Sequence, residues 1–233
     1  LCISVGDLRE VFGSDLAACL QRNFLLLGLK KSPVISQFTS AQQSGIAKAM
    51  DVRDYAAGTK IEKGFRFIIV VDGKLTGFAK RSRVTLERGQ WYEDATIVDS
   101  HCLGTKSDAE HAGLCDLVTG SSSTTRLGIL TKEGFANALK ELGLSAVGGA
   151  DDASDYTRKM VLVKKVHIFR HLSEEQTHNL VKALSSERHK KGTYAINQGE
   201  VGTSFFVIAS GEVSVMINDE HVRTLGKNAY FGE

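Results

Sequence analysis

Two histidines form the residue pair best spaced for metal chemistry in this sequence. His167 and His171 lie four residues apart, which puts two imidazole rings on one face of a helix, where they could bind a metal ion. No third ligand is evident near them, so we interpret both as ordinary surface or core histidines. The four cysteines form no C-x-x-C pair, which predicts reduced thiols in a cytosolic protein.

Motifs of catalysis are missing from the sequence. There is no G-x-G-x-x-G-x-V, H-R-D or D-F-G motif of a protein kinase and no H-E-x-x-H motif of a zinc enzyme. No nucleophile with a neighbouring base is evident either. We therefore expect this chain to carry no catalytic domain.

The size and composition predict one large or two small folded domains. The chain has 233 residues, of which 42% are hydrophobic, enough to bury a core. Its 29 Lys and Arg nearly balance 27 Asp and Glu, and this net charge of +2 argues against a nucleic-acid partner. The 23 glycines and single proline suit a β-rich fold with many tight turns. No apolar segment approaches the ~18 residues of a membrane span. The chain starts at Leu1 and stops at Glu233, and neither end looks like a natural terminus, so we expect it to be a piece of a longer protein.

One segment of the chain is repeated at a constant offset. Val34–Gly58 matches Ile168–Gly192, and each copy opens with a capping box, T-x-x-Q from Thr39 and S-x-x-Q from Ser173. An apolar stripe at helical spacing follows, and each copy ends at a glycine that turns the chain. The repeat predicts the same helix-first module twice.

Both copies continue as predicted strands. The apolar run Phe65–Val71 in the first copy matches Phe205–Ala209 in the second. In the second copy V-S-V-M-I from Val213 alternates and leads into an Asn-Asp turn, which predicts a hairpin. Further on, Thr85–Asp94 matches Thr224–Glu233.

The remaining elements set the expected domain boundaries. A closing strand is expected at Arg126–Leu130. Three further helices are expected, at Leu16–Leu29, Lys132–Leu142 and Thr157–Phe169. The resulting parts are a helical lead-in (1–30), a first domain (31–144), a linker (145–156) and a second domain (157–233).

The second copy resembles a cyclic-nucleotide-binding domain. The resemblance is carried by I-N-Q-G-E-V-G-T-S-F-F-V-I-A-S-G-E-V-S-V (Ile196–Val215) and R-T-L-G-K-N-A-Y-F-G-E (Arg223–Glu233). Together the copies resemble the third, degenerate, and fourth such domains in the regulatory region of apicomplexan cGMP-dependent protein kinases, with V-R-D-Y (Val52–Tyr55) and I-I-V-x-x-G-K (Ile68–Lys74) in the first. The resemblance implies an α+β fold of two tandem modules, each a β jelly-roll barrel with flanking helices.

The resemblance implies a cGMP site that opens at Phe231, Gly232 and Glu233. In that family the glycine lets the backbone approach the phosphate, and the carboxylate accepts a hydrogen bond from the ribose 2′-hydroxyl. The arginine that pairs with the phosphate would follow Glu233, so the second domain is expected to be truncated within this phosphate-binding cassette. Two other interpretations stay open: the glycines could be turn residues of any β protein, and Glu233 could be an ordinary exposed carboxylate.

The first copy departs from the family pattern at Tyr92, Glu93 and Asp94. Glu93 puts a negative charge where a backbone should meet the phosphate, and Asp94 is shorter than the glutamate it replaces. An unpaired carboxylate beside a buried phosphate should cost several kcal/mol, of the order of an uncompensated buried charge. We therefore expect the first module to bind no cyclic nucleotide.

The expected function is that of a cGMP-sensing allosteric region that relieves autoinhibition of a serine/threonine kinase. The kinase is expected to be cytoplasmic, and regions outside this chain could associate it with a membrane. Its partners would be cGMP and a kinase domain in the same polypeptide, and the protein would be a monomer. ATP and Mg²⁺ would bind only to that kinase domain, which this chain does not contain. Alternatives are a cAMP-binding regulatory subunit and a cyclic-nucleotide-responsive DNA-binding regulator. These residues do not distinguish cGMP from cAMP.

Overall fold

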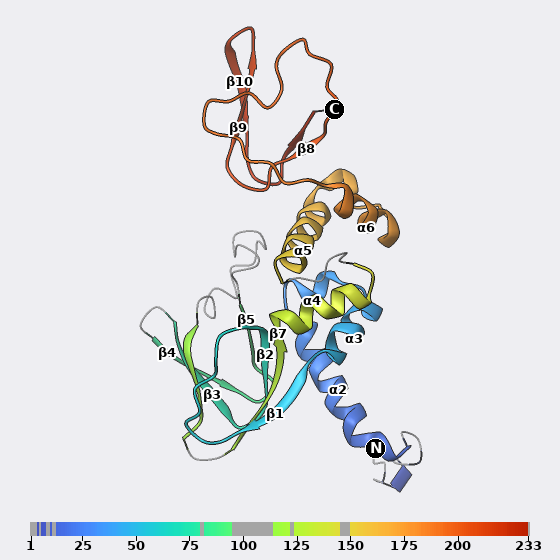
Figure 1. Ribbon diagram of the computed structural model, residues 1–233, viewed down its shortest axis with the longest axis vertical. Coiled ribbons are helices and arrows are strands. Elements are labelled where there is room, and N and C mark those ends of the chain that lie inside the picture. The colour runs from blue at the N-terminus through green and yellow to red at the C-terminus, as the bar shows by residue number, and fades with distance from the viewer. Residues whose placement is uncertain are drawn as a thin grey trace. The chain divides into compact units, whose positions relative to one another are not determined.

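The computed structural model describes residues 13–79, 82–94, 114–121, 124–144 and 150–232, together with residues 4, 6, 7 and 10 (Figure 1). It divides into two compact units, Leu1–Thr157 and Arg158–Glu233. Helix α5 (Ala150–Lys165) contains the point of division. The prediction that this helix starts at Thr157 is wrong, because it begins seven residues earlier, within the expected linker. The predicted domain boundaries stay predictions.

The first unit begins with a helical layer. The predicted helix at Leu16–Leu29 is confirmed as α2, and the chain then turns into a short 3₁₀ helix, η2, and helix α3. The capping box predicted at Thr39 is present, with the threonine hydroxyl accepting from the Gln42 backbone N–H and the Gln42 side chain accepting from the Thr39 N–H. The helices of this layer are η1 (Gly13–Asp15), α2 (Leu16–Leu29), η2 (Ile35–Gln37), α3 (Ser40–Lys48) and α4 (Lys132–Glu141).

The strands of the first unit form two antiparallel sheets. One has the order β1-β7-β2-β5 and the other the order β4-β3-β6. Their bounds are β1 (Asp51–Tyr55), β2 (Phe65–Asp72), β3 (Lys74–Ala79), β4 (Ser82–Glu87), β5 (Trp91–Glu93), β6 (Cys115–Thr119) and β7 (Thr125–Thr131). The closing strand predicted at Arg126–Leu130 is therefore confirmed as part of β7.

An apolar core lies between these two sheets. Ile68 and Leu127 of the four-stranded sheet pack in one buried cluster with Leu75, Leu86 and Leu117 of the other. The helices cover the outer face of the four-stranded sheet, as Figure 1 shows. The expected α+β class is thus confirmed, with antiparallel sheets in two layers, and the described strands do not close into one barrel.

Helix α2 packs very closely against the sheet. A Cβ on Gly28 would lie 2.2 Å from Cδ1 of Ile69, and one on Gly128 would lie 2.6 Å from Cδ2 of Leu25. Glycines at both positions therefore let helix and sheet approach each other. The helical layer is held firmly on the sheet that carries β5.

The second unit starts from the C-terminal part of α5 and repeats the helical motif. Its capping box at Ser173 is also present, as predicted. The predicted hairpin is confirmed, with Asn218 and Asp219 both at positive φ in its turn. Of the predicted apolar strand, Phe206–Val207 is a regular strand, and Ile208 continues it with backbone hydrogen bonds to Asn228 and Ala229. The elements are η5 (His167–Phe169), α6 (Glu174–Ala183), β8 (Phe206–Val207), β9 (Val213–Ile217), β10 (Glu220–Leu225) and β11 (Tyr230–Phe231), in the sheets β10-β9 and β11-β8.

The backbone confirms the repeat at its turns. Gly58 and Gly192, which match in the sequence, have φ of +72° and +83°. Before the last strand of each copy, Gly89 has φ of +81° and its counterpart Asn228 has φ of +66°. Asparagine tolerates this left-handed conformation better than most residues, so the same turn is kept with a different residue. Among the described residues, no helix is both long enough and apolar enough to cross a bilayer.

Candidate functional site

The residues predicted to open the nucleotide site lie at the end of β11. This strand pairs antiparallel with β8, so that Phe231 lies opposite Phe206, and their rings stack with centroids 5.0 Å apart. Tyr230 stacks in the same way on Phe205, with centroids 5.5 Å apart. Two aromatic stacks thus fix the strand that leads into Gly232. Glu233 lies outside the described residues.

Gly232 is held in a conformation that other residues avoid. Its φ is +90°, and a Cβ at this position would lie 2.3 Å from the Ser204 carbonyl oxygen. The close approach of the Ser204 backbone therefore requires glycine at this position, even without a ligand. The part that Gly232 would take in contacting a phosphate stays a prediction.

The matching residues of the first module lie on β5 and alternate between two environments. Tyr92 points into the core between the sheets, where its ring packs edge-on against Phe65 at 5.8 Å and its hydroxyl donates to the Leu114 carbonyl at 3.3 Å. Glu93 is a regular strand residue paired opposite Phe67. Its backbone therefore lacks the positive φ of Gly232, and its side chain leaves the opposite face of the strand from Tyr92.

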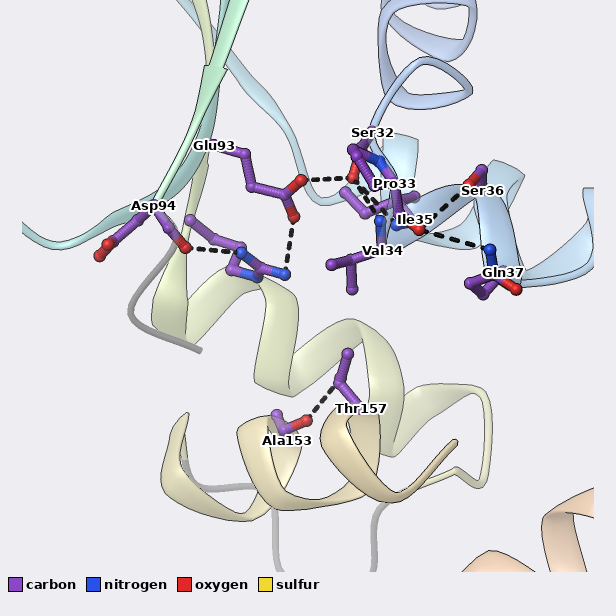
Figure 2. Close-up of polar contacts among 11 residues, drawn as sticks. Ser32, Pro33, Val34, Ile35, Ser36, Gln37, Glu93, Asp94, Ala153 and Thr157 are labelled. Atoms are coloured by element: carbon purple, nitrogen blue, oxygen red, sulfur yellow. Dashed lines mark hydrogen bonds and ion pairs between the residues drawn. The ribbon is translucent and has the colours of Figure 1, made fainter. Parts of the chain in front are cut away.

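The Glu93 carboxylate ends in a buried polar cluster. Oε1 lies 2.7 Å from Nη2 of Arg66, and Oε2 accepts a hydrogen bond of 2.6 Å from the Ser32 hydroxyl (Figure 2). The Ser32 oxygen in turn accepts from the backbone N–H groups of Ile35 at 2.9 Å and Val34 at 3.3 Å. We call the contacts among Ser32, Arg66 and Glu93 the Ser32–Arg66–Glu93 junction. The junction joins β2 and β5 to the start of η2.

The junction is almost completely removed from water. The side chains of Arg66 and Glu93 are 1% and 9% exposed. Burial raises the pKa of the Glu93 carboxyl, while the Arg66 charge and the Ser32 hydrogen bond oppose this rise. The expectation that Glu93 is an unpaired carboxylate is wrong, because Arg66 supplies its counter-charge.

Asp94 continues the polar contacts at the end of β5. Arg66 donates from Nη1 to the Asp94 carbonyl at 3.0 Å, and the Asp94 N–H donates to the Arg66 carbonyl at the same distance. The Asp94 carboxylate forms an ion pair of 2.9 Å with Lys132 at the start of α4. Asp94 is thus engaged with the helical layer as well.

The second module has different residues at all three junction positions. Ile68 pairs with Tyr92 in the first module, and Phe206 pairs with Phe231 in the second, so Ile68 and Phe206 are equivalent. Two residues before them lie Arg66 and Ser204, which therefore also match. The constant offset of the helical repeat matches Ser32 with Val166, and Glu93 matches Gly232. The first module therefore has serine, arginine and glutamate where the second has valine, serine and glycine. The first module thus carries two opposite charges at positions where the second carries none.

Comparison with known proteins finds similarity along the whole chain. The chain is 31% identical over 239 residues to a cGMP-dependent protein kinase of Plasmodium berghei and 31% identical over 258 residues to one of Toxoplasma gondii; both alignments cover 100% of this chain. Over its full length the chain is homologous to a segment of the apicomplexan cGMP-dependent protein kinases. It spans about a quarter of the length of these relatives, 26% and 24% respectively.

Other relatives match less of the chain or match it less well. A cAMP-dependent protein kinase type II regulatory subunit of Drosophila melanogaster is 39% identical over 71 residues, 30% of this chain and 19% of that protein. The regulatory domain of Toxoplasma gondii PKA, solved with cAMP, covers 91% of this chain and 79% of its own at 18% identity, with a TM-score of 0.34. No protein-family model matches the chain.

Arg66 and Ser32 were not predicted as site residues from the sequence. Arg66 interrupts the otherwise apolar run Phe65–Val71, and a charged residue in a buried strand predicts a buried partner of opposite charge. That signal was available. Ser32 gave no comparable signal, because its partner Glu93 lies 61 residues away in the sequence.

Proposed function

We propose that this chain is the cGMP-sensing allosteric part of a cGMP-dependent serine/threonine protein kinase. In this proposal the second module binds cGMP and the first module binds no nucleotide. The observation that carries the assignment is the contrast at one matched position, where Gly232 has φ of +90° and Glu93 is a strand residue with a buried, paired side chain. The full-length similarity to cGMP-dependent kinases supports the choice of ligand.

In the second module, the end of β11 would deliver the backbone to the ligand. Phe231 is fixed by its stack on Phe206, and Gly232 carries no side chain that would hinder a phosphate. Backbone N–H groups following Gly232 would face the phosphate, and Glu233 would accept the hydrogen bond of the ribose 2′-hydroxyl. The phosphate-pairing arginine would come from residues that follow Glu233.

In the first module, the position that matches Gly232 carries the Glu93 side chain, which is bound by Arg66 and Ser32. The guanidinium of Arg66 is already used by Glu93 and by the Asp94 carbonyl. A nucleotide phosphate at β5 would meet a strand backbone with no glycine and the nearby carboxylate of Asp94. The first module would then act as a structural element that transmits movement of the second.

The wider assignment covers the rest of the protein. Ligand closure of the second module would release a kinase domain in the same polypeptide, which would use ATP and Mg²⁺, in a monomeric cytoplasmic protein. A ligand shifts such an equilibrium only by its preference for one state, commonly ~1–3 kcal/mol of coupling.

The test is calorimetric titration of cGMP into a chain extended beyond Glu233, with Glu233→Ala as the matched variant. We expect one site per chain, weakened at least about tenfold by Glu233→Ala, since a charge-assisted hydrogen bond is worth about 1.5–3 kcal/mol. Two sites per chain, or full affinity in the variant, would contradict the assignment of sites to modules.

A cAMP-binding regulatory function is the second candidate. The 71-residue match to the Drosophila cAMP-dependent kinase subunit favours it. Titration of cAMP in the same experiment separates the two. If cAMP binds more tightly than cGMP, the regulatory function stands with the other nucleotide.

A further inference from the structure

The Ser32–Arg66–Glu93 junction joins the helical layer of the first unit to its four-stranded sheet, in addition to the apolar contacts and the Asp94–Lys132 ion pair. Strands β2 and β5 contribute Arg66 and Glu93, and Ser32 lies just before η2. Ser32 itself is fully buried. Its hydroxyl donates to Glu93 and accepts from Val34 and Ile35, so the carboxylate fixes the direction in which this hydroxyl points.

The second module contains no such connection. Its counterparts are Val166, Ser204 and Gly232, which carry no charge, and Gly232 packs directly against the Ser204 carbonyl. Val166, at the position that matches Ser32, precedes η5 and has no hydroxyl that could bond to a carboxylate. The two modules differ in how their helices are attached to the strand that precedes the cassette.

We propose that the Ser32–Arg66–Glu93 junction keeps the η2 segment permanently docked on β5 in the first unit, without any bound molecule. Glu93 supplies from within the chain the anion that holds Arg66 and Ser32 in place. The first unit is thereby fixed in one arrangement of helices and sheet, whereas the second has an uncharged contact at the same place. This inference goes beyond the proposed function and does not depend on which nucleotide the second module takes.

Hydrogen exchange measured by mass spectrometry on the full 233-residue chain tests the proposal. The reporters are the backbone N–H groups of residues 34–38, which bond to Ser32 and to neighbouring carbonyls within η2. Glu93→Gln keeps the shape of the side chain and removes its charge. We expect exchange of these reporters to become roughly ten- to hundredfold faster, as loss of a hydrogen bond to a charged group predicts, and to be accelerated by a larger factor than exchange of the amides of β2 and β7.

A matched control separates a local effect from a general loss of charge. Glu87→Gln removes a carboxylate from an exposed ion pair with Lys74, whose nitrogen and oxygen lie 2.8 Å apart, and should leave the reporters unchanged. If Glu93→Gln leaves exchange at residues 34–38 unchanged, or speeds exchange in β2 and β7 equally, the proposal is overturned.

A second variant covers the case in which Glu93→Gln does not fold. Ser32→Val, Arg66→Ser and Glu93→Gly together install the residues of the second module and leave no buried charge. This triple variant should fold with η2 exchanging faster than in the parent chain. A parent-like exchange rate at residues 34–38 would equally overturn the proposal.

Discussion

Removing the positive charge of the junction should destabilise the first unit strongly. We consider Arg66→Met, which keeps an unbranched side chain of similar reach but leaves the Glu93 carboxylate without its counter-charge. The side chains of Arg66 and Glu93 are 1% and 9% exposed, so water cannot replace the lost partner. Breaking a buried pair from one side costs about 3–5 kcal/mol.

Two further contacts of Arg66 set the size of this loss. The guanidinium donates to the Asp94 carbonyl at 3.0 Å and lies 5.5 Å from the centre of the Phe135 ring. Both contacts disappear in Arg66→Met, which favours the upper end of the range. A loss of about 4 kcal/mol lowers the melting temperature by roughly 10 °C in a unit of this size.

The loss should depend on pH in a defined direction. Without Arg66, burial raises the pKa of Glu93 further above its value in the unfolded chain, so the native state takes up a proton more readily. The carboxyl then favours folding below its unfolded pKa and loses this advantage as pH rises through its folded pKa. The deficit of Arg66→Met should therefore be largest at pH values above the folded pKa of Glu93 and shrink as pH falls towards the unfolded pKa of this carboxyl.

Denaturant unfolding of the full chain at several pH values measures this deficit. Adding Glu93→Met to Arg66→Met should recover most of the stability, because a buried pair replaced by apolar residues of similar volume is often neutral or better. Lys74→Met, in an exposed pair, should cost less than about 1 kcal/mol. If Arg66→Met costs no more than Lys74→Met, or if the double variant is as unstable as the sum of its parts, the junction does not stabilise the unit as argued.

Three other predictions use the same chain. Gly232→Ala should weaken cGMP binding at least about tenfold in an extended chain, because a non-glycine residue at this φ costs ~1–3 kcal/mol and its Cβ would lie 2.3 Å from the Ser204 oxygen; unchanged affinity by calorimetry would contradict it. Thr39→Ala and Ser173→Ala should each cost about 1 kcal/mol in denaturant unfolding through loss of a capping box, whereas a loss near zero in both would mean that the caps are not formed in solution. Burial raises the pKa of Tyr156 to about 12, so its contribution to stability is complete below about pH 10 and is lost as pH rises through about 12. Burial raises the pKa of Tyr92 as well, so phenolate absorbance should show a late transition whose amplitude Tyr156→Phe reduces; a variant that titrates like the parent would refute this.

Local signals in the sequence were sufficient for the elements with strong caps or turns. Both capping boxes were predicted correctly because the two residues of each lie three positions apart. The helix at Leu16–Leu29 was predicted correctly although no side chain caps its N-terminus. The start of α5 was missed, although Asp151 and Asp152 in its first turn favour a helix N-terminus. The glycine and alanine residues around them favoured the prediction of a linker at 145–156.

Contacts between distant segments explain what could not be predicted. The strand expected at Phe205–Ala209 is regular only at Phe206–Val207, since Ile208 bonds to Asn228 and Ala229 in the turn that leads into β11. The Ser32–Arg66–Glu93 junction depends on residues brought together by the fold. From the sequence, Glu93 was correctly identified as a departure from the binding pattern, but its carboxylate was expected to be unpaired, whereas it forms an ion pair with Arg66.

The paired charges of the junction also limit how the first module can change over generations. Replacing Glu93 by glycine alone leaves the Arg66 guanidinium buried without a counter-ion, and replacing Arg66 alone leaves the carboxylate in the same condition. Either single substitution towards the residues of the second module should therefore destabilise the first unit. The residue that is tolerated at one of the two positions depends on the residue at the other, so the difference between the modules resists change one residue at a time.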